Sequence, residues 1–311
     1  MRVVFLGSGA FAIPSFEALL EAGHDVAALV TQPDREKGRG RGMGPPPSKP
    51  VAESRGIPVL QPRRVRDPDA VEELRALRPE VQVVVAYGQI LPRAVIDLAP
   101  RGTVNVHASL LPRYRGAAPI QWAIARGERE TGVTTMLIDE GLDTGPTLLS
   151  AATAIGADET ADELEPRLAR MGAELLVATL AGLEEGTLQP VHQDHARASL
   201  APMLRKEDGL VDWRLPAPEL AARVRGFRPW PSTTSALHGR PVKLLRARAE
   251  AGGGGEPGEV VAVDHDGIVV AAGAGTRLRL LEVQPQSRRP MAAHAFAAGA
   301  RIRPGARFGG A

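Results

Sequence analysis

Residues 1–188 alternate between short apolar segments and amphipathic segments, and this alternation restricts the possible folds more than any other feature of the chain. The strand-like segments are residues 3–6, 26–30, 81–86, 104–106 and 133–138, and helical spacing marks residues 14–22, 51–55, 70–78 and 160–183. Residues 81–86 are rich in β-branched side chains, which is typical of a strand that is buried on both faces. Strands that alternate with helices predict a Rossmann-like α/β fold, in which a parallel sheet carries helices on both faces.

The pattern changes after residue 188. Residues 189–206 are polar and contain Pro190 and Pro202, which predicts a linker. Beyond the linker, short strand-like segments separated by close turns predict a small β-barrel of the OB-like kind. These segments are residues 242–245, 260–263, 267–271 and 278–283. We therefore expect an α/β domain at residues 1–188, a linker at 189–206 and a β-barrel domain at 207–311.

Composition narrows the cellular setting. The 311 residues include no Cys, which excludes disulfides and thiolate zinc sites and suits a reducing cytoplasm. The first residues read as a buried strand that runs into a turn, and they lack the pattern of a secretory signal peptide. No apolar run approaches the roughly 20 residues that a membrane span needs. We expect a cytoplasmic protein that does not act at a membrane.

The charge is unevenly distributed although the net charge is only +2. Residues 205–311 hold 17 Lys and Arg against 10 Asp and Glu, a net of +7, whereas the rest holds 21 against 26, a net of −5. A basic C-terminal third suggests a polyanionic partner. A solvated Arg-rich surface is the alternative interpretation.

The densest group of chemically useful side chains lies in residues 105–116. Asn105 and His107 are two residues apart on a predicted strand, so both side chains point to one face, at the strand end where open α/β sheets bind ligands. Asp143 follows in a glycine-bounded loop. An amide, an imidazole and a carboxylate suit acyl transfer, which needs an oxyanion donor, a proton acceptor and a group that supports the imidazole. Alone, the Asn-x-His pattern fits more simply a histidine that is hydrogen-bonded to backbone.

The longer pattern is more specific. Asn-x-His-x-Ser-Leu-Leu-Pro, followed about 30 residues later by Leu-Asp-x-Gly-Pro, resembles the 10-formyltetrahydrofolate-dependent formyltransferases. The resemblance implies that Asn105, His107 and Asp143 are catalytic. It also implies that two segments border the folate, and these contribute Ser109, Leu110, Leu111 and Pro112, and Tyr87, Gly88 and Ile90. With no Cys, and no Ser in a nucleophile elbow, we expect direct transfer without a formyl-enzyme.

Residues 31–52 indicate which branch of the family the chain resembles. Thr-Gln-Pro-Asp-Arg, Gly-Arg-Gly-Arg-Gly and Pro-Pro-Ser-x-Pro-Val-Ala are similar to methionyl-tRNA formyltransferases, which insert a basic loop here that reaches the tRNA acceptor arm. The resemblance implies tRNA contacts from Arg35, Lys37, Arg39 and Arg41, and from Lys206 in a second matching segment. Residues 33–49 carry a net charge of +3 and are rich in Gly and Pro, so we expect no stable helix and a mobile segment in the absence of tRNA. A disordered basic surface loop is the alternative.

The implied activity is transfer of the formyl group of 10-formyltetrahydrofolate to the amino group of methionyl-initiator tRNA, with no metal, DNA or membrane involved. A related formyltransferase that acts on a small amine would keep the three catalytic residues but would not need the basic loop. A non-catalytic tRNA-binding protein would not need the three residues.

A nicotinamide-dependent oxidoreductase is suggested by the Gly-x-Gly-x-x-Ala pattern of residues 7–12, but Asp34 lies beyond the strand end, so we interpret these glycines as a strand-to-helix turn. His192 and His195 have a metal-like spacing, yet they lie in the proline-bounded linker without a third ligand. We interpret that segment as solvated.

Overall fold

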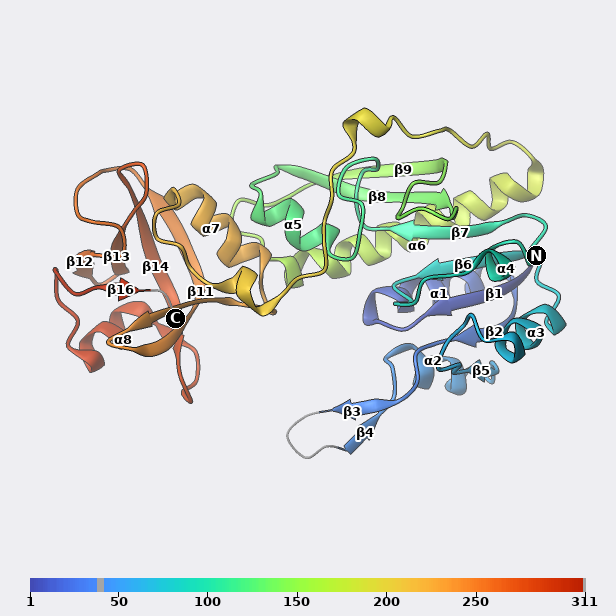
Figure 1. Cartoon of the computed structure of the whole chain (residues 1–311), viewed down its shortest axis with the longest axis horizontal. Coiled ribbons are helices and arrows are strands. Elements are labelled where there is room, and N and C mark those ends of the chain that lie inside the picture. The colour runs from blue at the N-terminus through green and yellow to red at the C-terminus, as the bar shows by residue number, and fades with distance from the viewer. Residues whose placement is uncertain (38–41, 310–311) are drawn as a thin grey trace. The chain divides into compact units, whose positions relative to one another are not determined.

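The computed structural model describes residues 1–37 and 42–309, which form two compact units (Figure 1). The N-terminal unit contains Met1–Gly116, Thr131–Thr153 and Glu165–Leu200. The C-terminal unit contains Ala117–Glu130, Ala154–Leu164 and Ala201–Ala311. Both units are therefore discontinuous in sequence, and the boundaries expected at residues 188 and 206 stay a prediction.

The N-terminal unit is built on a seven-stranded sheet with the order β5-β2-β1-β6-β7-β8-β9. Its strands are β1 (Arg2–Gly7), β2 (Asp25–Val30), β5 (Val59–Leu60), β6 (Val81–Val85), β7 (Thr103–His107), β8 (Glu130–Leu137) and β9 (Thr147–Ala154). Every residue of β6 is buried, as the β-branched pattern predicted. The chain moves outward in one direction from β1 to β2 and β5, and in the other from β6 to β7. The boundary between β1 and β6 is the kind of switch point at which such sheets bind ligands.

The sheet is mixed rather than wholly parallel, which corrects the sequence-based expectation at one edge. The pairs β5–β2, β2–β1, β1–β6 and β6–β7 are parallel, but β8 runs antiparallel to β7, with His107 opposite Thr134. A parallel return requires a crossover helix packed on the sheet. The helix between β7 and β8, α5 (Pro119–Ala125), packs instead against α7 (Ala217–Gly226) in the C-terminal unit.

Amphipathic helices bury their apolar faces against this sheet. The helical segments are α1 (Ile13–Glu21), α2 (Ser48–Ser54), α3 (Pro68–Ala76), α4 (Arg93–Ile96), α6 (Ala161–Glu185) and the 3-10 turns Ala10–Ala12 and His195–Arg197. Phe16 of α1 is fully buried and meets Phe5 of β1 edge-on, with ring centroids 5.3 Å apart. Val4, Val84 and Leu74 belong to one buried cluster, so strands and helices share a core that holds the strand ends in place.

The basic segment at residues 33–49 contains a two-stranded antiparallel ribbon, β3 (Arg35–Lys37) and β4 (Gly42–Gly44). The expectation of no stable helix holds for residues 33–37 and 42–47, but α2 begins at Ser48 and therefore includes the last two residues of this segment. The Lys49 ammonium lies 3.1 Å from the Asp34 carboxylate and 2.8 Å from the Gln61 side-chain oxygen. These contacts anchor the base of the ribbon.

The C-terminal unit is a curled antiparallel sheet with the order β12-β13-β14-β11-β10-β16, and β15 pairs with β14. Its strands are β10 (Thr233–Leu237), β11 (Arg240–Glu250), β12 (Val260–Asp264), β13 (Gly267–Ala272), β14 (Thr276–Pro285), β15 (Met291–Ala292) and β16 (Phe308–Gly309). Hydrogen bonds of 2.8 Å from the Phe308 N–H to the Gly258 carbonyl and from the Val260 N–H to the Ala306 carbonyl join the two edges. This agrees with the barrel-like fold that the short strands predicted.

The helical segments that the structure describes in this unit are α5, α7, α8 (Ala293–Ala300), the first turn of α6 and the 3-10 turn Lys206–Gly209. Phe227, which follows α7, is fully buried and meets Trp122 of α5 edge-on, with ring centroids 5.3 Å apart. A Cβ on Gly226 would lie 2.6 Å from the Ala125 nitrogen, so only glycine permits this approach of α5 and α7. Among the described residues, none of the helices combines the length and apolar character that crossing a membrane requires.

Candidate active site

Asn105 and His107 lie on β7. This strand is hydrogen-bonded to β6 on one side and to β8 on the other. Asn105 is opposite Val84 on one side and Met136 on the other, and its side chain is half-buried. Within the described part of the chain, the Asn105 amide makes no hydrogen bond, which leaves both N–H groups available to a ligand. His107 ends the strand and is only 6% exposed. The structure therefore gives both side chains positions at the end of one central strand, as predicted.

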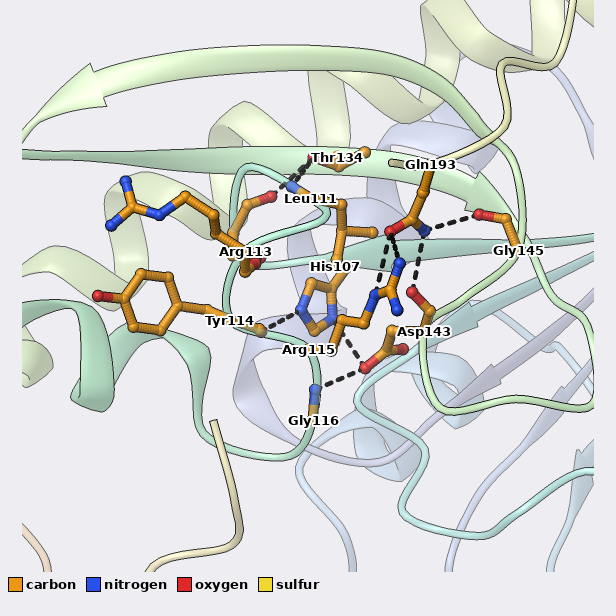
Figure 2. A network of polar contacts seen from close by, with 11 residues as sticks. His107, Leu111, Arg113, Tyr114, Arg115, Gly116, Thr134, Asp143, Gly145 and Gln193 are labelled. Atoms are coloured by element: carbon orange, nitrogen blue, oxygen red, sulfur yellow. Dashed lines mark hydrogen bonds and ion pairs between the residues drawn. The ribbon is translucent and has the colours of Figure 1, made fainter. Parts of the chain in front are cut away.

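The backbone selects the tautomer of His107. Its Nε2 lies 2.9 Å from the Tyr114 carbonyl oxygen, which can only accept a hydrogen bond, so Nε2 carries the hydrogen (Figure 2). In the neutral ring, Nδ1 then has a free lone pair. The backbone carbonyl of Tyr114, rather than the carboxylate of Asp143, therefore fixes the tautomer. Tyr114 has a φ of +60°, a left-handed conformation that turns its carbonyl toward the imidazole ring.

Asp143 faces the other edge of the imidazole. Its Oδ2 lies 3.7 Å from His107 Nδ1 and accepts a 2.8 Å hydrogen bond from the Gly116 N–H. Asp143 has a φ of +51°, a left-handed conformation that Asp adopts more readily than most residues. Close packing holds its loop against β8, because a Cβ on Gly145 would lie 1.9 Å from the Leu137 carbonyl oxygen.

The predicted folate segment after β7 forms a tight turn. Ser109 is fully buried, and its hydroxyl donates to the Arg113 carbonyl at 2.6 Å. Thr134 Oγ1 donates to the Ser109 carbonyl at 2.7 Å and accepts from the Leu111 N–H at 3.2 Å. Leu110, Leu111 and Pro112 are half-buried, so they offer apolar surface beside the catalytic candidates. A ligand would thus meet the leucines and the proline rather than the serine hydroxyl.

The second predicted folate segment follows β6. The Tyr87 ring is 2% exposed within the apolar core, and burial raises the pKa of its phenol to about 12. The contribution of Tyr87 to folate binding stays a prediction. Gly88 has a φ of +83°, and Ile90 presents a side chain that is 94% exposed. Leu142, in the Asp143 loop, is also exposed.

The site also includes two buried side chains that the sequence patterns did not indicate, Gln193 and Arg115. Gln193 donates from Nε2 to the carbonyls of Asp143 at 2.9 Å and Gly145 at 2.7 Å. Its Oε1 accepts from Arg115 Nε at 3.1 Å and Nη2 at 2.6 Å (Figure 2). The interpretation of residues 192–195 as a solvated segment is therefore wrong for Gln193, which is 8% exposed. Its neighbours His192 and His195 are exposed, as expected.

Comparisons with known proteins identify the family of the chain. The formyl transferase family matches residues 1–180, and the formyl transferase C-terminal domain matches residues 203–301. A methionyl-tRNA formyltransferase of Citrifermentans bemidjiense is 50% identical over 309 residues, which is 99% of this chain and 96% of that protein. A methionyl-tRNA formyltransferase of Solibacter usitatus is 52% identical over 303 residues, which is 97% of this chain and 96% of that protein. The chain belongs to the methionyl-tRNA formyltransferase family.

A solved structure shows the same fold in a more distant protein. It is an N-formyltransferase from Helicobacter canadensis in complex with folinic acid and dTDP-3-aminofucose, and it aligns with a TM-score of 0.68 at 16% identity. The alignment covers 91% of this chain and 98% of that one. The fold of this methionyl-tRNA formyltransferase family member is therefore shared over nearly its whole length.

The predicted tRNA residues of this family member are only partly described. Arg35 lies on β3, is exposed and donates from Nη2 to the Gln32 side-chain oxygen at 2.9 Å. Lys37 is the last residue of β3, and Arg39 and Arg41 lie outside the described residues. Lys206 is exposed on the 3-10 turn Lys206–Gly209. The structure thus places Arg35 and Lys206 at the surface of different units and does not test their contacts.

Gly7, the first glycine of the apparent dinucleotide pattern, has a packing role in this family member. A Cβ on Gly7 would lie 2.6 Å from a ring carbon of Phe5 and 2.9 Å from the Ala12 methyl group. Gly7 is therefore needed where β1 approaches the following helical turn. Ser8 donates to the Tyr87 carbonyl at 3.1 Å, which ties this turn to the end of β6. The interpretation as a strand-to-helix turn agrees with these contacts.

Proposed function

We propose that this protein transfers the formyl group of 10-formyltetrahydrofolate to the amino group of methionyl-initiator tRNA in the cytoplasm. The observation that carries the proposal is the arrangement of Asn105, His107 and Asp143, with the amide of Asn105 unpaired among the described residues and the imidazole held between a backbone carbonyl and a carboxylate. The name shared by relatives that are about half identical over nearly the whole chain supports the choice of acceptor.

In the proposed reaction, the methionine amine attacks the formyl carbon, and the carbonyl oxygen becomes an oxyanion. The Asn105 amide donates a hydrogen bond to that oxyanion. The amine loses its proton to the lone pair of His107 Nδ1, since Nε2 is already committed to the Tyr114 carbonyl. The Asp143 carboxylate stabilises the imidazolium that results.

Collapse of the tetrahedral intermediate breaks the bond between the formyl carbon and N10 of the folate. The proton held by His107 passes to N10, so the products are formylmethionyl-tRNA and tetrahydrofolate. The apolar surface of Leu110, Leu111, Pro112 and Ile90 would border the folate. Arg35, Lys37, Arg39, Arg41 and Lys206 would contact the phosphates of the tRNA. The direct transfer requires neither a covalent enzyme intermediate nor a metal.

The test is incubation of the purified protein with 10-formyltetrahydrofolate and methionyl-initiator tRNA, followed by measurement of formylmethionine released from the tRNA. We expect formylation of the charged initiator tRNA and none when the methionine amine is already blocked by acetylation. Failure to formylate the tRNA, together with efficient formylation of a small amine such as an amino sugar nucleotide, would replace this proposal with the alternative acceptor class.

A further inference from the structure

Residues 191–200, which we call the strap, run along the candidate active site and are attached to both of its loops. The strap begins at Val191, whose N–H and carbonyl pair with Thr147 at 2.8 and 2.9 Å. It ends at Ser199, whose carbonyl accepts from the Arg115 N–H at 2.8 Å and whose hydroxyl accepts from the Tyr114 N–H at 2.9 Å. The segment expected to be a linker is therefore tied down at both ends.

Gln193 lies in the strap, and both the nitrogen and the oxygen of its side-chain amide are fully hydrogen-bonded. The two hydrogens of Nε2 go to the carbonyl oxygens of Asp143 and Gly145, on either side of Thr144. The oxygen accepts two N–H groups of the Arg115 guanidinium. One side chain thus connects the loop that carries Asp143 with the loop that follows His107 (Figure 2).

Arg115 determines which way the Gln193 amide points. Arg115 is only 6% exposed, and a buried charge is costly unless its N–H groups find acceptors. Gln193 Oε1 accepts from two of these groups, and His195 Nδ1 lies 3.2 Å from Nη1. A flipped amide would turn its N–H groups against the guanidinium and its oxygen against two carbonyls. Arg115 therefore holds the Gln193 amide in the orientation in which Nε2 donates to the Asp143 loop.

The Asp143 loop needs such support. A non-glycine residue with a left-handed φ is in a sparsely populated conformation, which persists where the surroundings determine it. The φ of Asp143 is +51°, and the carbonyl of this residue is one of the two that Gln193 holds. The same conformation directs the carboxylate to His107 Nδ1 and the Gly116 N–H.

We propose that Gln193 is a positioning residue, oriented by Arg115, that holds the Asp143 carboxylate beside His107. The strap is then a part of the active site rather than a tether between units. This inference rests on the proposed function for its kinetic consequence, but the placement of Asp143 can be measured without any reaction.

The decisive variant is Gln193→Glu. It still accepts from Arg115 but replaces the two N–H groups with an oxygen that repels the carbonyls of Asp143 and Gly145. We expect kcat to fall by about 10- to 100-fold, the range that follows from a catalytic group displaced by about 1 Å. The equilibrium Kd for tetrahydrofolate should change less than about twofold, because folate contacts are not assigned to Gln193. His192→Ala, an exposed neighbour in the same strap, is the control and should behave as wild type.

A double-mutant cycle separates positioning from general damage. If Gln193 acts through Asp143, then Gln193→Glu should cost about twofold or less when it is introduced into Asp143→Ala, since the group that it positions is already gone. Multiplicative losses in the double variant would overturn the proposal, because they would show that Gln193 affects the rate by another route.

Hydrogen exchange of the Gly116 amide gives the readout that is independent of activity. This N–H is held by Asp143 Oδ2, so Gln193→Glu should accelerate its exchange, whereas His192→Ala should not. Faster exchange supports the placement even if the wild-type protein proves to formylate a different acceptor. Unchanged exchange in a folded Gln193→Glu protein would overturn the proposal whatever the acceptor.

A shorter amide provides a second variant if Gln193→Glu does not fold. Gln193→Asn keeps the chemistry but cannot span the distance between Arg115 and the two carbonyls. We expect the same loss of kcat and the same faster exchange at Gly116. A folded Gln193→Asn protein with wild-type kcat and exchange would overturn the proposal.

Discussion

Two groups of polar and charged side chains, one in each unit, are held in opposite ways. In the N-terminal unit, His107, Arg115 and Gln193 are buried, and each is held by hydrogen bonds to backbone or to another buried group. In the C-terminal unit, Arg246 and Arg248 pair with Glu163 and Asp158 at 2.6 Å, and all four side chains are well exposed to solvent.

The difference shows how one chain can combine a rigid site with an adaptable surface. Buried hydrogen bonds fix the positions of their groups, because leaving one unpaired is costly in a low dielectric. Exposed ion pairs contribute little, since solvent and salt screen them and their side chains can exchange partners. We therefore expect substitutions in the first region to act on kcat, and substitutions in the second to act on salt-dependent binding and modestly on stability.

The largest effect is expected from the catalytic candidates. Asn105→Ala removes the donor to the oxyanion and His107→Ala removes the proton acceptor, and each should lower kcat by on the order of 10² or more. Steady-state formylation kinetics would measure the loss, with His238→Ala, an exposed histidine of the other unit, as control. If folded Asn105→Ala had a kcat near that of wild type, the prediction would be wrong, and the buried site of the N-terminal unit would not be the catalytic one.

The next effect is expected in the basic segment. Arg39→Ala should lower kcat/KM for charged tRNA by about tenfold, as loss of one charge-assisted phosphate contact does, and leave folate affinity unchanged. The slope of log kcat/KM against log salt should also decrease by about one. Glu36→Gln on β3 changes the charge in the opposite direction and should not weaken the reaction. If Arg39→Ala had the wild-type kcat/KM for charged tRNA at two salt concentrations, the prediction would be wrong and the segment would be a solvated tether.

A smaller effect is expected from Lys206 in the C-terminal unit. Lys206→Ala should raise KM for tRNA by a few-fold and lower the salt slope by about one, with kcat unchanged. Removal of residues 207–311 is a less specific experiment, because it would also remove the packing of Phe227 against Trp122. A fall in kcat with an unchanged salt slope would contradict a phosphate-binding role for Lys206.

The smallest effect concerns stability and its pH dependence. The Thr160 N–H and the Arg246 guanidinium hold the pKa of Glu163 below its ordinary value. A carboxyl with a lowered pKa stabilises the folded state fully above its ordinary pKa of about 4.3, and this stabilisation is lost as the pH falls below that value. Glu163→Gln should therefore lower Tm at pH 7 by no more than about 3 °C, and the difference should shrink toward pH 3.

Glu174→Gln, an exposed position on the same helix, is the control for this measurement. Thermal unfolding of both variants across pH would decide the matter. A loss of stability that persists unchanged at low pH would show that Glu163 acts through packing rather than through its charge.

Several elements were predictable because their signal is local. The β-branched run at Val81–Val85 predicted a fully buried strand, and the structure places β6 inside the sheet. The two-residue spacing of Asn105 and His107 predicted a shared face at a strand end. The glycines beside Asp143 predicted a tight loop, which Gly145 provides by its close approach to Leu137.

Other features were missed because no local pattern encodes them. The direction of β8 depends on where α5 packs, and Phe227, more than a hundred residues beyond that helix, supplies the apolar contact. The strands Thr233–Leu237 and Phe308–Gly309 are short, and they become strands through pairing with partners. Gln193 resembled any polar linker residue, because its partners Asp143 and Arg115 lie 50 and 78 positions away.

The sequence by itself determined the alternation of strands and helices, because periodicity is a property of neighbouring residues, and its resemblance to the formyltransferase family supplied the three catalytic candidates. Only the tertiary structure decided which nitrogen of His107 is free, which way Asp143 points and what holds it there. Those outcomes depend on the Tyr114 carbonyl, which accepts from His107, and on the N–H groups that Gly116 and Gln193 donate to Asp143. A polar side chain in a sequence carries its donors and acceptors, but the partners that orient them are brought together only when the chain folds.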